Sequence, residues 1–186
     1  MAALRLLGIS GSLRRDSFNT ALLRTAVTLL PDDVTLELRT LHGIPLYDGD
    51  VEAQGIPAEV RALREAIHAA DGLVLSSPEY NNSLPGVFKN TIDWLSRGAG
   101  QPFAGKPVVL MSASPGGFGG ARAQLAWLPV FAALGAHSMH SPQFYLSAAH
   151  QAFAPDGALA EERTREQLRK LLATFARWCR GPAAQA

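Results

Sequence analysis

Residues 10–19 gather side chains that suit the binding of an anion, reading Ser-Gly-Ser-Leu-Arg-Arg-Asp-Ser-Phe-Asn. The apolar stretch before them, 4–9, predicts a buried strand, and apolar residues at helical spacing follow from Ala21. A strand that leads through a loop into a helix directs free backbone N–H groups and the positive end of the helix dipole to one place. The sequence therefore predicts an anion site where this helix begins.

The type of anion follows from what this loop contains and lacks. Arg14 supplies a guanidinium group whose geometry matches phosphate oxygens. Neutral donors are available at Ser10, Ser12, Ser17 and Asn19. The GxGxxG pattern of dinucleotide sites and the GxxxxGK pattern of nucleotide triphosphate sites do not fit the loop. We predict a site for a phosphate monoester on a small ligand; the alternative is an ordinary helix start capped by Asp16 or Ser17.

A second loop, Pro78-Glu79-Tyr80-Asn81, directly follows another predicted strand. Pro78 stiffens the turn, Tyr80 offers a flat face for stacking, and Asn81 with the loop amides can bind the edge of a heterocycle. A third loop, 112–120, follows the next strand and contains four glycines, which let a backbone approach a ligand closely. Taken alone, these loops could also be a plain turn and a flexible connection.

These loops require a particular set of elements to position them. We expect strands at 4–9, 34–38, 72–77, 107–111 and 138–141, alternating with five helices, the last of which contains Leu168, Leu171, Leu172 and Phe175. The continuous apolar centre of the third strand predicts burial on both faces. The fold class is therefore α/β, with a doubly wound five-stranded parallel sheet and helices on both faces. We expect 41–55 to be a solvated loop, and Pro129 to kink or split its helix.

Composition limits the alternatives. A chain of 186 residues with 47% hydrophobic content suits a single domain over 1–186, with 181–186 as a frayed tail. Basic and acidic residues number 17 and 16, without a basic stripe, so we expect no nucleic-acid partner. Cys179 is the single cysteine, which favours a cytoplasmic protein. We expect no membrane partner, because no apolar run is long enough, and no metal site, because the histidines lack ligand spacing.

The motifs taken together resemble those of the NADPH-dependent FMN reductase family, a flavodoxin-like group that includes bacterial chromate, quinone and azo-dye reductases. The matching segments are Gly11-Ser12-Leu13-Arg14 with Ser17 and Asn19, then 78–81, and then Gly86 to Trp94. The resemblance extends from about Leu4 to about Phe175. It implies the strand order 2-1-3-4-5, in which the loops after strands one, three and four meet outside the carboxyl ends of the strands.

The resemblance also implies a cofactor, FMN, and NADPH or NADH as the hydride donor. We expect the first loop to hold the phosphate, and 78–81 and 112–114 to surround the ring. No side chain receives a catalytic role, and Glu79 is not assigned as a general base, because the hydride is transferred on the flavin itself. The residues expected to bind the cofactor are Ser10, Gly11, Ser12, Leu13, Arg14, Ser17, Phe18, Asn19, Pro78, Glu79, Tyr80, Asn81, Ala113, Ser114 and Gly116.

The implied activity is a two-electron ping-pong transfer from NAD(P)H via FMN to quinones, azo compounds, chromate-like oxyanions or free flavin. A flavodoxin-like electron carrier or an FMN-binding redox sensor without turnover remains the alternative, although flavodoxins are typically acidic and this chain is not. The family also implies a homodimer, or a tetramer, with helix 86–95 at the interface. Trp94 lies off the apolar stripe of that helix, so it faces either a partner subunit or the core.

Overall fold

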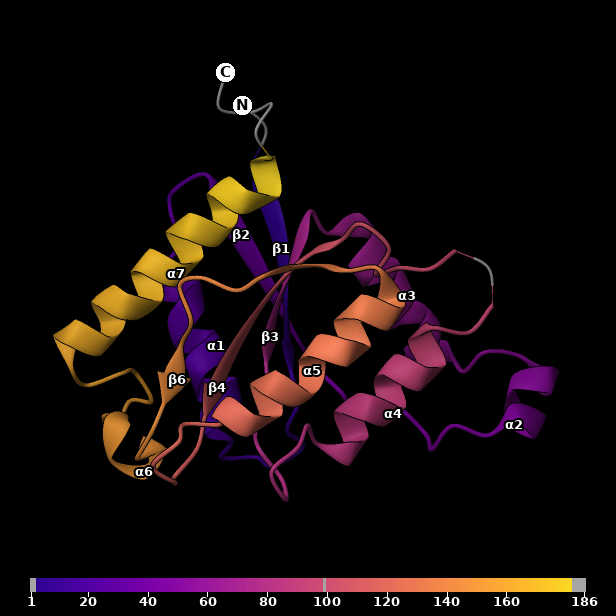
Figure 1. The fold of residues 1–186 in the computed structure, drawn as a ribbon, viewed down its shortest axis with the longest axis horizontal. Coiled ribbons are helices and arrows are strands. Elements are labelled where there is room, and N and C mark those ends of the chain that lie inside the picture. Colours follow the sequence, from indigo (N-terminus) through magenta and orange to yellow (C-terminus); the bar gives the residue numbers. More distant parts are fainter. Residues whose placement is uncertain (1–2, 99, 182–186) are drawn as a thin grey trace.

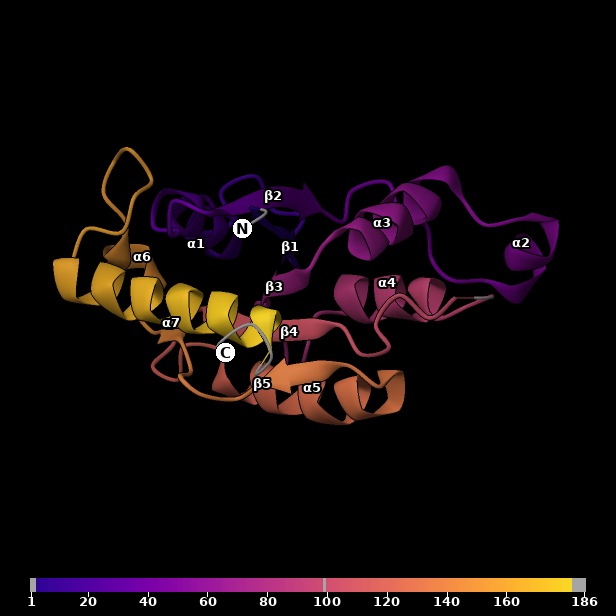
Figure 2. The same ribbon diagram turned by 90° about the horizontal axis from the view of Figure 1, so that it is seen from above.

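Parallel strands in the order β2-β1-β3-β4-β5 form the central sheet of the protein, seen here in a computed structural model that describes residues 3–98 and 100–181. Helices cover both faces of the sheet (Figures 1 and 2). The strands are β1 (Leu4–Ser10), β2 (Val34–Thr40), β3 (Gly72–Ser76), β4 (Pro107–Ala113) and β5 (His137–Met139). This arrangement confirms the predicted flavodoxin-like fold.

The helices that connect and cover the strands are α1 (Phe18–Thr28), α2 (Gly49–Gln54), α3 (Ala58–Ala69), α4 (Gly86–Leu95), α5 (Ala121–Leu134), α6 (Ala149–Ala152) and α7 (Glu162–Arg180). The expectation of only a loop at 41–55 was wrong, because it contains α2. The Asp48 side chain accepts a hydrogen bond from the Asp50 N–H and begins this helix. Two further elements escaped the pattern because they are too short for periodicity: α6, and a strand β6 (Tyr145–Leu146) that pairs with the end of β4.

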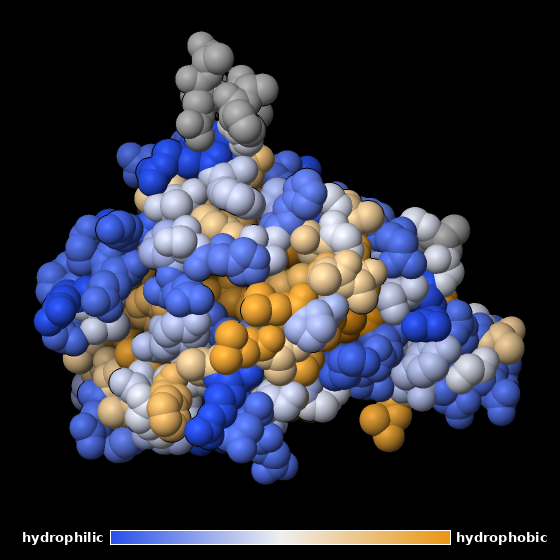
Figure 3. All heavy atoms as spheres, viewed as in Figure 1, coloured by the Kyte–Doolittle hydropathy of each residue, from blue (hydrophilic) through white to orange (hydrophobic). Residues whose placement is uncertain are grey.

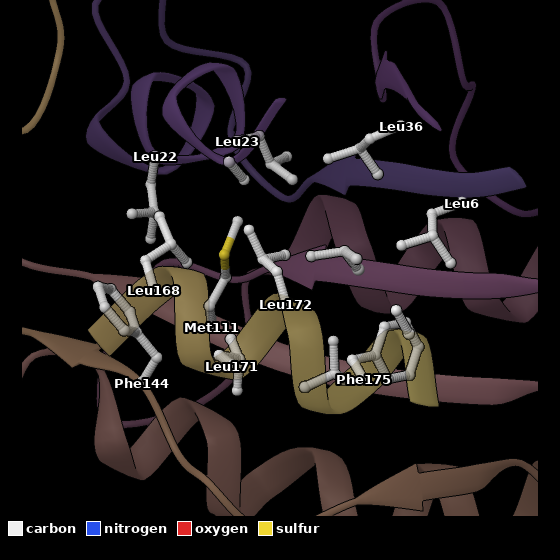
Figure 4. Close-up of a cluster of buried hydrophobic side chains, with 14 of the residues drawn as sticks. Leu6, Leu22, Leu23, Leu36, Met111, Phe144, Leu168, Leu171, Leu172 and Phe175 are labelled. Atoms are coloured by element: carbon white, nitrogen blue, oxygen red, sulfur yellow. The ribbon is translucent and has the colours of Figure 1, made fainter. Parts of the chain in front are cut away.

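Each face of the sheet has its own hydrophobic core, because neighbouring residues of a strand point to opposite faces. Leu6 packs towards α1 and α7, whereas Leu7 packs towards α3, α4 and α5. Figure 4 shows the first core, in which the apolar stripe of α7 meets leucines of α1. That stripe is Leu168, Leu171, Leu172 and Phe175, all fully buried as expected. The two cores fix the sheet, and with it the positions of the loops at its carboxyl edge.

Pro129 does not split its helix, contrary to the possibility raised by the sequence. Helix α5 runs without interruption from Ala121 to Leu134 and includes Pro129. The proline lies on the exposed side, whereas Trp127 and Phe131 are buried. A carbonyl group left without its helical N–H partner there can bind water instead, which reduces the cost of the missing donor.

Trp94 belongs to the core and does not face a partner. Its side chain is fully buried, and its Nε1–H donates to the Pro45 carbonyl at 2.9 Å. The ring also meets Tyr47 edge-on.

No helix in the described part of the chain is long and apolar enough to cross a membrane. Apart from Gly181, the tail expected at 181–186 lies outside the described residues.

Candidate functional site

Three loops meet at the carboxyl edge of the sheet and enclose a hollow of about 260 Å³. They leave the ends of β1, β3 and β4, the strands whose loops were expected to converge. The hollow is lined by Ser12, Arg14, Ser17, Phe18, Asn19, Pro78, Glu79, Tyr80, Ala113, Ser114 and Pro115. The structure therefore brings together most of the residues that the sequence analysis assigned to cofactor binding.

The β1–α1 loop presents hydrogen-bond donors to this hollow. Ser17 caps α1, where its Oγ accepts from the Thr20 N–H, and the Oγ of Ser12 accepts from the Arg14 N–H. Both hydroxyl groups keep their own hydrogen for a ligand. The first N–H groups of α1 have no acceptor within the helix. The Arg14 guanidinium lies over the Phe18 ring, 5.0 Å from its centroid, beside the same helix end. This is the donor set that a phosphate group needs.

Asn19 and Ser10 have a different position from the one expected of phosphate donors. The Asn19 amide is buried between β3 and β4: it donates to the Ala113 carbonyl and accepts from the Ser76 hydroxyl and the Ala113 N–H. Ser10 is fully buried and hydrogen-bonds Thr20. These two side chains connect the loops to the sheet, although Asn19 is among the residues that line the hollow.

Gly11 and Leu13 shape the loop without lining the hollow. A Cβ atom at Gly11 would lie 2.3 Å from Cδ1 of Phe88, so no larger residue fits there without displacement. The Gly11 N–H donates to the Ser76 carbonyl, which fixes the loop against β3. Leu13 is exposed, and its carbonyl accepts from Nε2 of His42. Glycine is therefore required here by close packing against Phe88.

The loop after β3 is a tight hairpin turn with an aromatic wall. The N–H of Tyr80 bonds the Ser83 carbonyl, and the reverse pair also forms, both at 3.1 Å. Between them, Asn81 and Asn82 have φ of 51° and 62°, a left-handed conformation that asparagine tolerates. Tyr80 is half exposed beside the hollow, with Pro78 next to it. Asn81 lies in the turn and does not line the hollow.

Glu79 lines the hollow, but its carboxylate is engaged in capping another element. One oxygen accepts hydrogen bonds from the N–H groups of Arg122, at 2.9 Å, and Ala123, at 3.2 Å, at the start of α5. The Arg122 guanidinium in turn donates to Oδ1 of Asn82. The turn after β3 and helix α5 therefore hold each other in place.

Two of the four glycines after β4, Gly119 and Gly120, are required by close packing within the protein. A Cβ atom on Gly119 would lie 2.8 Å from the Tyr145 carbonyl carbon, and one on Gly120 would lie 2.7 Å from Cβ of Ser112. Both residues have positive φ. Ala113 and Ser114 line the hollow as expected. Gly116 does not, although its N–H bonds Oγ of Ser114 and so orients that hydroxyl group.

Several residues that support the site were not found from the sequence. Within α5, the Trp127 Nε1–H donates to Oγ of Ser77, and Gln124 donates to Oγ of Ser112. Pro115 lines the hollow. The signal available in the sequence was a glutamine, Gln124, among the apolar residues of this helix. In the described residues, no group of three or more His, Cys, Asp or Glu side chains is placed to hold a metal ion.

Comparison with known proteins agrees with this geometry. Residues 4–151 match the sequence model of the NADPH-dependent FMN reductase family. An NAD(P)H-dependent FMN reductase of Pseudomonas aeruginosa is 44% identical over 95% of this chain and 96% of its own length. A quinone reductase of Escherichia coli is 41% identical, with 92% and 93% covered. The solved structure of FerB, a flavoenzyme NAD(P)H:(acceptor) oxidoreductase of Paracoccus denitrificans, is 34% identical over 95% of this chain and 97% of its own, with a TM-score of 0.84.

Proposed function

The chain belongs to the NADPH-dependent FMN reductase family and is an NAD(P)H-dependent oxidoreductase that uses FMN, and we propose that its acceptors are quinones, reduced in a ping-pong cycle. When bound, FMN takes a hydride from NAD(P)H and supplies two electrons to the acceptor. Donor and acceptor would use the same open side of the flavin site, where Tyr80 is half exposed, so the donor has to leave before the acceptor enters. Azo compounds, chromate-like oxyanions and free flavin belong to the same proposal, as further acceptors.

The observation that carries this proposal is the convergence of a phosphate-type donor set with an aromatic, largely apolar wall in one hollow. Arg14, the hydroxyl groups of Ser12 and Ser17, and the first N–H groups of α1 suit the flavin phosphate. Pro78, Tyr80 and the 113–115 backbone suit a flat heterocycle. The residues present therefore fit FMN.

We assign the side chains that line the hollow to binding and orientation, and none of them to proton transfer. Glu79 is the carboxylate beside the hollow, and the start of α5 already occupies the oxygen that accepts two backbone N–H groups. Its engagement explains why we assign it a positioning role and no general-base role. Tyr80 remains half exposed, so a planar acceptor can approach from solvent against an aromatic face.

A spectroscopic titration tests the proposal. The purified protein receives FMN, and its visible absorption is recorded before and after anaerobic addition of NADPH, followed by a quinone. We expect a protein-bound flavin band that NADPH bleaches and the quinone restores. A bound flavin that NADPH leaves unchanged would favour an electron carrier or a sensor, and a lack of FMN binding would contradict the site itself.

We also propose that the protein self-associates, as a homodimer or a tetramer, in a reducing cytoplasm. Figure 3 shows hydrophobic residues gathered over α5, whereas α7 presents a hydrophilic surface. Leu125 and Leu128 of α5 are exposed by 61% and 39%. Apolar patches of this kind support protein contacts. Light scattering on the protein and on Leu125→Glu tests this: we expect an oligomer that the variant weakens, and a monomeric parent protein would contradict it.

A further inference from the structure

A second hollow adjoins the proposed flavin phosphate site and has a different character. Its volume is about 460 Å³, and it shares Ser12 and Arg14 with the first hollow. The remaining residues that line it are Leu13, Arg15, Thr20, Arg24, Thr40 and His42. They come from the β1–α1 loop, from α1 and from the end of β2, so no single stretch of sequence revealed the cluster. The shared residues make the two hollows contiguous.

Positive charge dominates this second hollow. Arg14, Arg15 and Arg24 line it, and no carboxylate does. Among residues 3–98 and 100–181, the ion pairs within 4 Å include none of these three arginines. The neighbouring Arg39, by contrast, pairs with Glu37. Several guanidinium groups around one concavity, without an acidic partner, produce a local potential that attracts anions.

Hydrogen bonds of His42 hold one part of the wall of this hollow in place. Nε2 of His42 donates to the Leu13 carbonyl at 3.1 Å, and Nδ1 lies 3.0 Å from Oγ1 of Thr40. Because a carbonyl only accepts, Nε2 carries the hydrogen. These contacts connect the end of β2 to the loop that carries Arg14 and Arg15. The loop that carries Arg14 and Arg15 is therefore fixed against the end of β2, and the exposed guanidinium groups of both residues lie at the rim of the hollow, where they can turn towards an anion.

We propose that this hollow is a second phosphate site, which binds a nucleotide phosphate other than the 5′-phosphate of FMN. The inference rests on the proposed function, because the first phosphate occupies Arg14. The guanidinium groups of Arg15 and Arg24 are then not needed for the FMN phosphate and remain available for a second one. Two nucleotides carry a suitable further phosphate: NADPH, at its 2′-position, and FAD, whose adenylate phosphate is joined directly to the flavin phosphate.

Two binding measurements separate these sources, and neither requires turnover. Flavin fluorescence gives the affinities of the cofactor-free protein for FMN and FAD. Calorimetry on the FMN-loaded protein gives the affinities for 2′,5′-ADP and 5′-AMP, which carry and lack the 2′-phosphate. Both are repeated with Arg15→Gln/Arg24→Gln. The matched control is Arg61→Gln/Arg163→Gln, which removes the same charge from α3 and α7, outside the hollow.

We expect the test variant to lose roughly tenfold in affinity for either FAD or 2′,5′-ADP, the scale of one charge-assisted contact. FMN binding should change by less than about threefold, because exposed charges beyond direct contact are screened. The ligand that loses affinity identifies the source of the phosphate. The proposal is wrong if the test variant binds FAD and 2′,5′-ADP as tightly as the parent protein does. It is also wrong if the control variant loses as much affinity for these ligands as the test variant. A parent protein that does not bind FMN would instead contradict the proposed function.

Discussion

Glu79 and Arg122 connect the turn after β3 to the first residues of α5: the Glu79 carboxylate accepts the Arg122 N–H at 2.9 Å. The N-cap residue of α5 is Gly120, which has no side chain to satisfy the free N–H groups there. A carboxylate from another loop thus supplies the cap, and its charge is favourable at the positive end of the helix. The same contact fixes the turn that carries Tyr80.

Glu79→Ala should therefore destabilise the protein and weaken cofactor binding together. Losing the cap should lower the free energy of unfolding by about 1–2 kcal/mol. FMN affinity should fall as well, because the turn loses its anchor. Urea unfolding and fluorescence titration measure the two effects. Glu79→Gln keeps one accepting oxygen and should lie between Glu79→Ala and the parent, whereas Glu65→Ala, exposed on α3, should match the parent.

Arg14→Ala tests the phosphate assignment directly. Loss of a charge-assisted hydrogen bond should weaken FMN binding by roughly 1.5–3 kcal/mol. The fold should persist, because the side chain is exposed and its contact with Phe18 is local. Fluorescence titration gives the affinity, and circular dichroism checks the fold. Arg61→Ala, on α3, serves as the charge control. An affinity for FMN equal to that of the parent would exclude Arg14 from the site.

Much of the fold could be predicted because its elements are long and strongly patterned. The stripe of α7 and the continuous apolar centre of β3 indicated a helix on a doubly covered sheet, and the structure has both. The short elements α2 and α6 could not be found by periodicity, because helices of six and four residues have fewer than two turns and show no repeat. The local effect of Pro129 also depended on which side of α5 faces solvent, and tertiary packing decides that.

The site was predictable in its loops but less so in the roles of single residues. Composition indicated that the β1–α1 loop binds an anion, and it correctly gave Ser17 as a possible cap. The composition of the loops could not distinguish side chains that face the hollow from side chains that hold its loops in place by hydrogen bonds. Asn19 and Glu79 are polar and lie in loops, yet their partners are distant in sequence, at Ala113 and Arg122. Such long-range hydrogen bonds have no local signature.

Gly11→Ala should show how tightly the first loop is packed. The added methyl group would lie 2.3 Å from Phe88 Cδ1 and 3.1 Å from the Pro78 ring. Overpacking of this kind typically costs about 1–3 kcal/mol of folding stability. Thermal or urea unfolding measures it. Gly86→Ala is the matched control, since a Cβ atom there meets nothing within 4 Å. Adding Phe88→Leu to Gly11→Ala should restore part of the loss; no recovery would argue against the clash.

Asn19→Ala tests whether the Asn19 side chain stabilises the loop or binds the ligand. The Asn19 amide satisfies the Ser76 hydroxyl and both backbone groups of Ala113. Leaving such buried groups unpaired costs about 1–3 kcal/mol each, so we expect a loss of at least about 2 kcal/mol in unfolding free energy. FMN affinity should fall less than in Arg14→Ala. The opposite pattern, with unchanged unfolding and a large loss of FMN affinity, would assign this side chain to the phosphate.

Cys179 should be unreactive in the folded protein despite being the single cysteine. Burial, followed by the nearby Asp71 carboxylate, raises the pKa of its thiol from 9.0 to about 12. The thiolate is the reactive form, so a thiol reagent at pH 8 should modify the folded protein at least about a hundredfold more slowly than the urea-unfolded protein.

The same raised pKa makes a prediction for stability at alkaline pH. The folded state retains the Cys179 proton up to about pH 12, whereas the unfolded chain releases it above its ordinary value of 9.0. The contribution of this group to stability is therefore complete below pH 9 and is lost as the pH rises towards 12. Urea unfolding at pH 8 and pH 10 measures the decline, and Cys179→Ser isolates it from other titrating groups. An equal decline in Cys179→Ser, or rapid modification of the folded protein, would show that this thiol is not shielded.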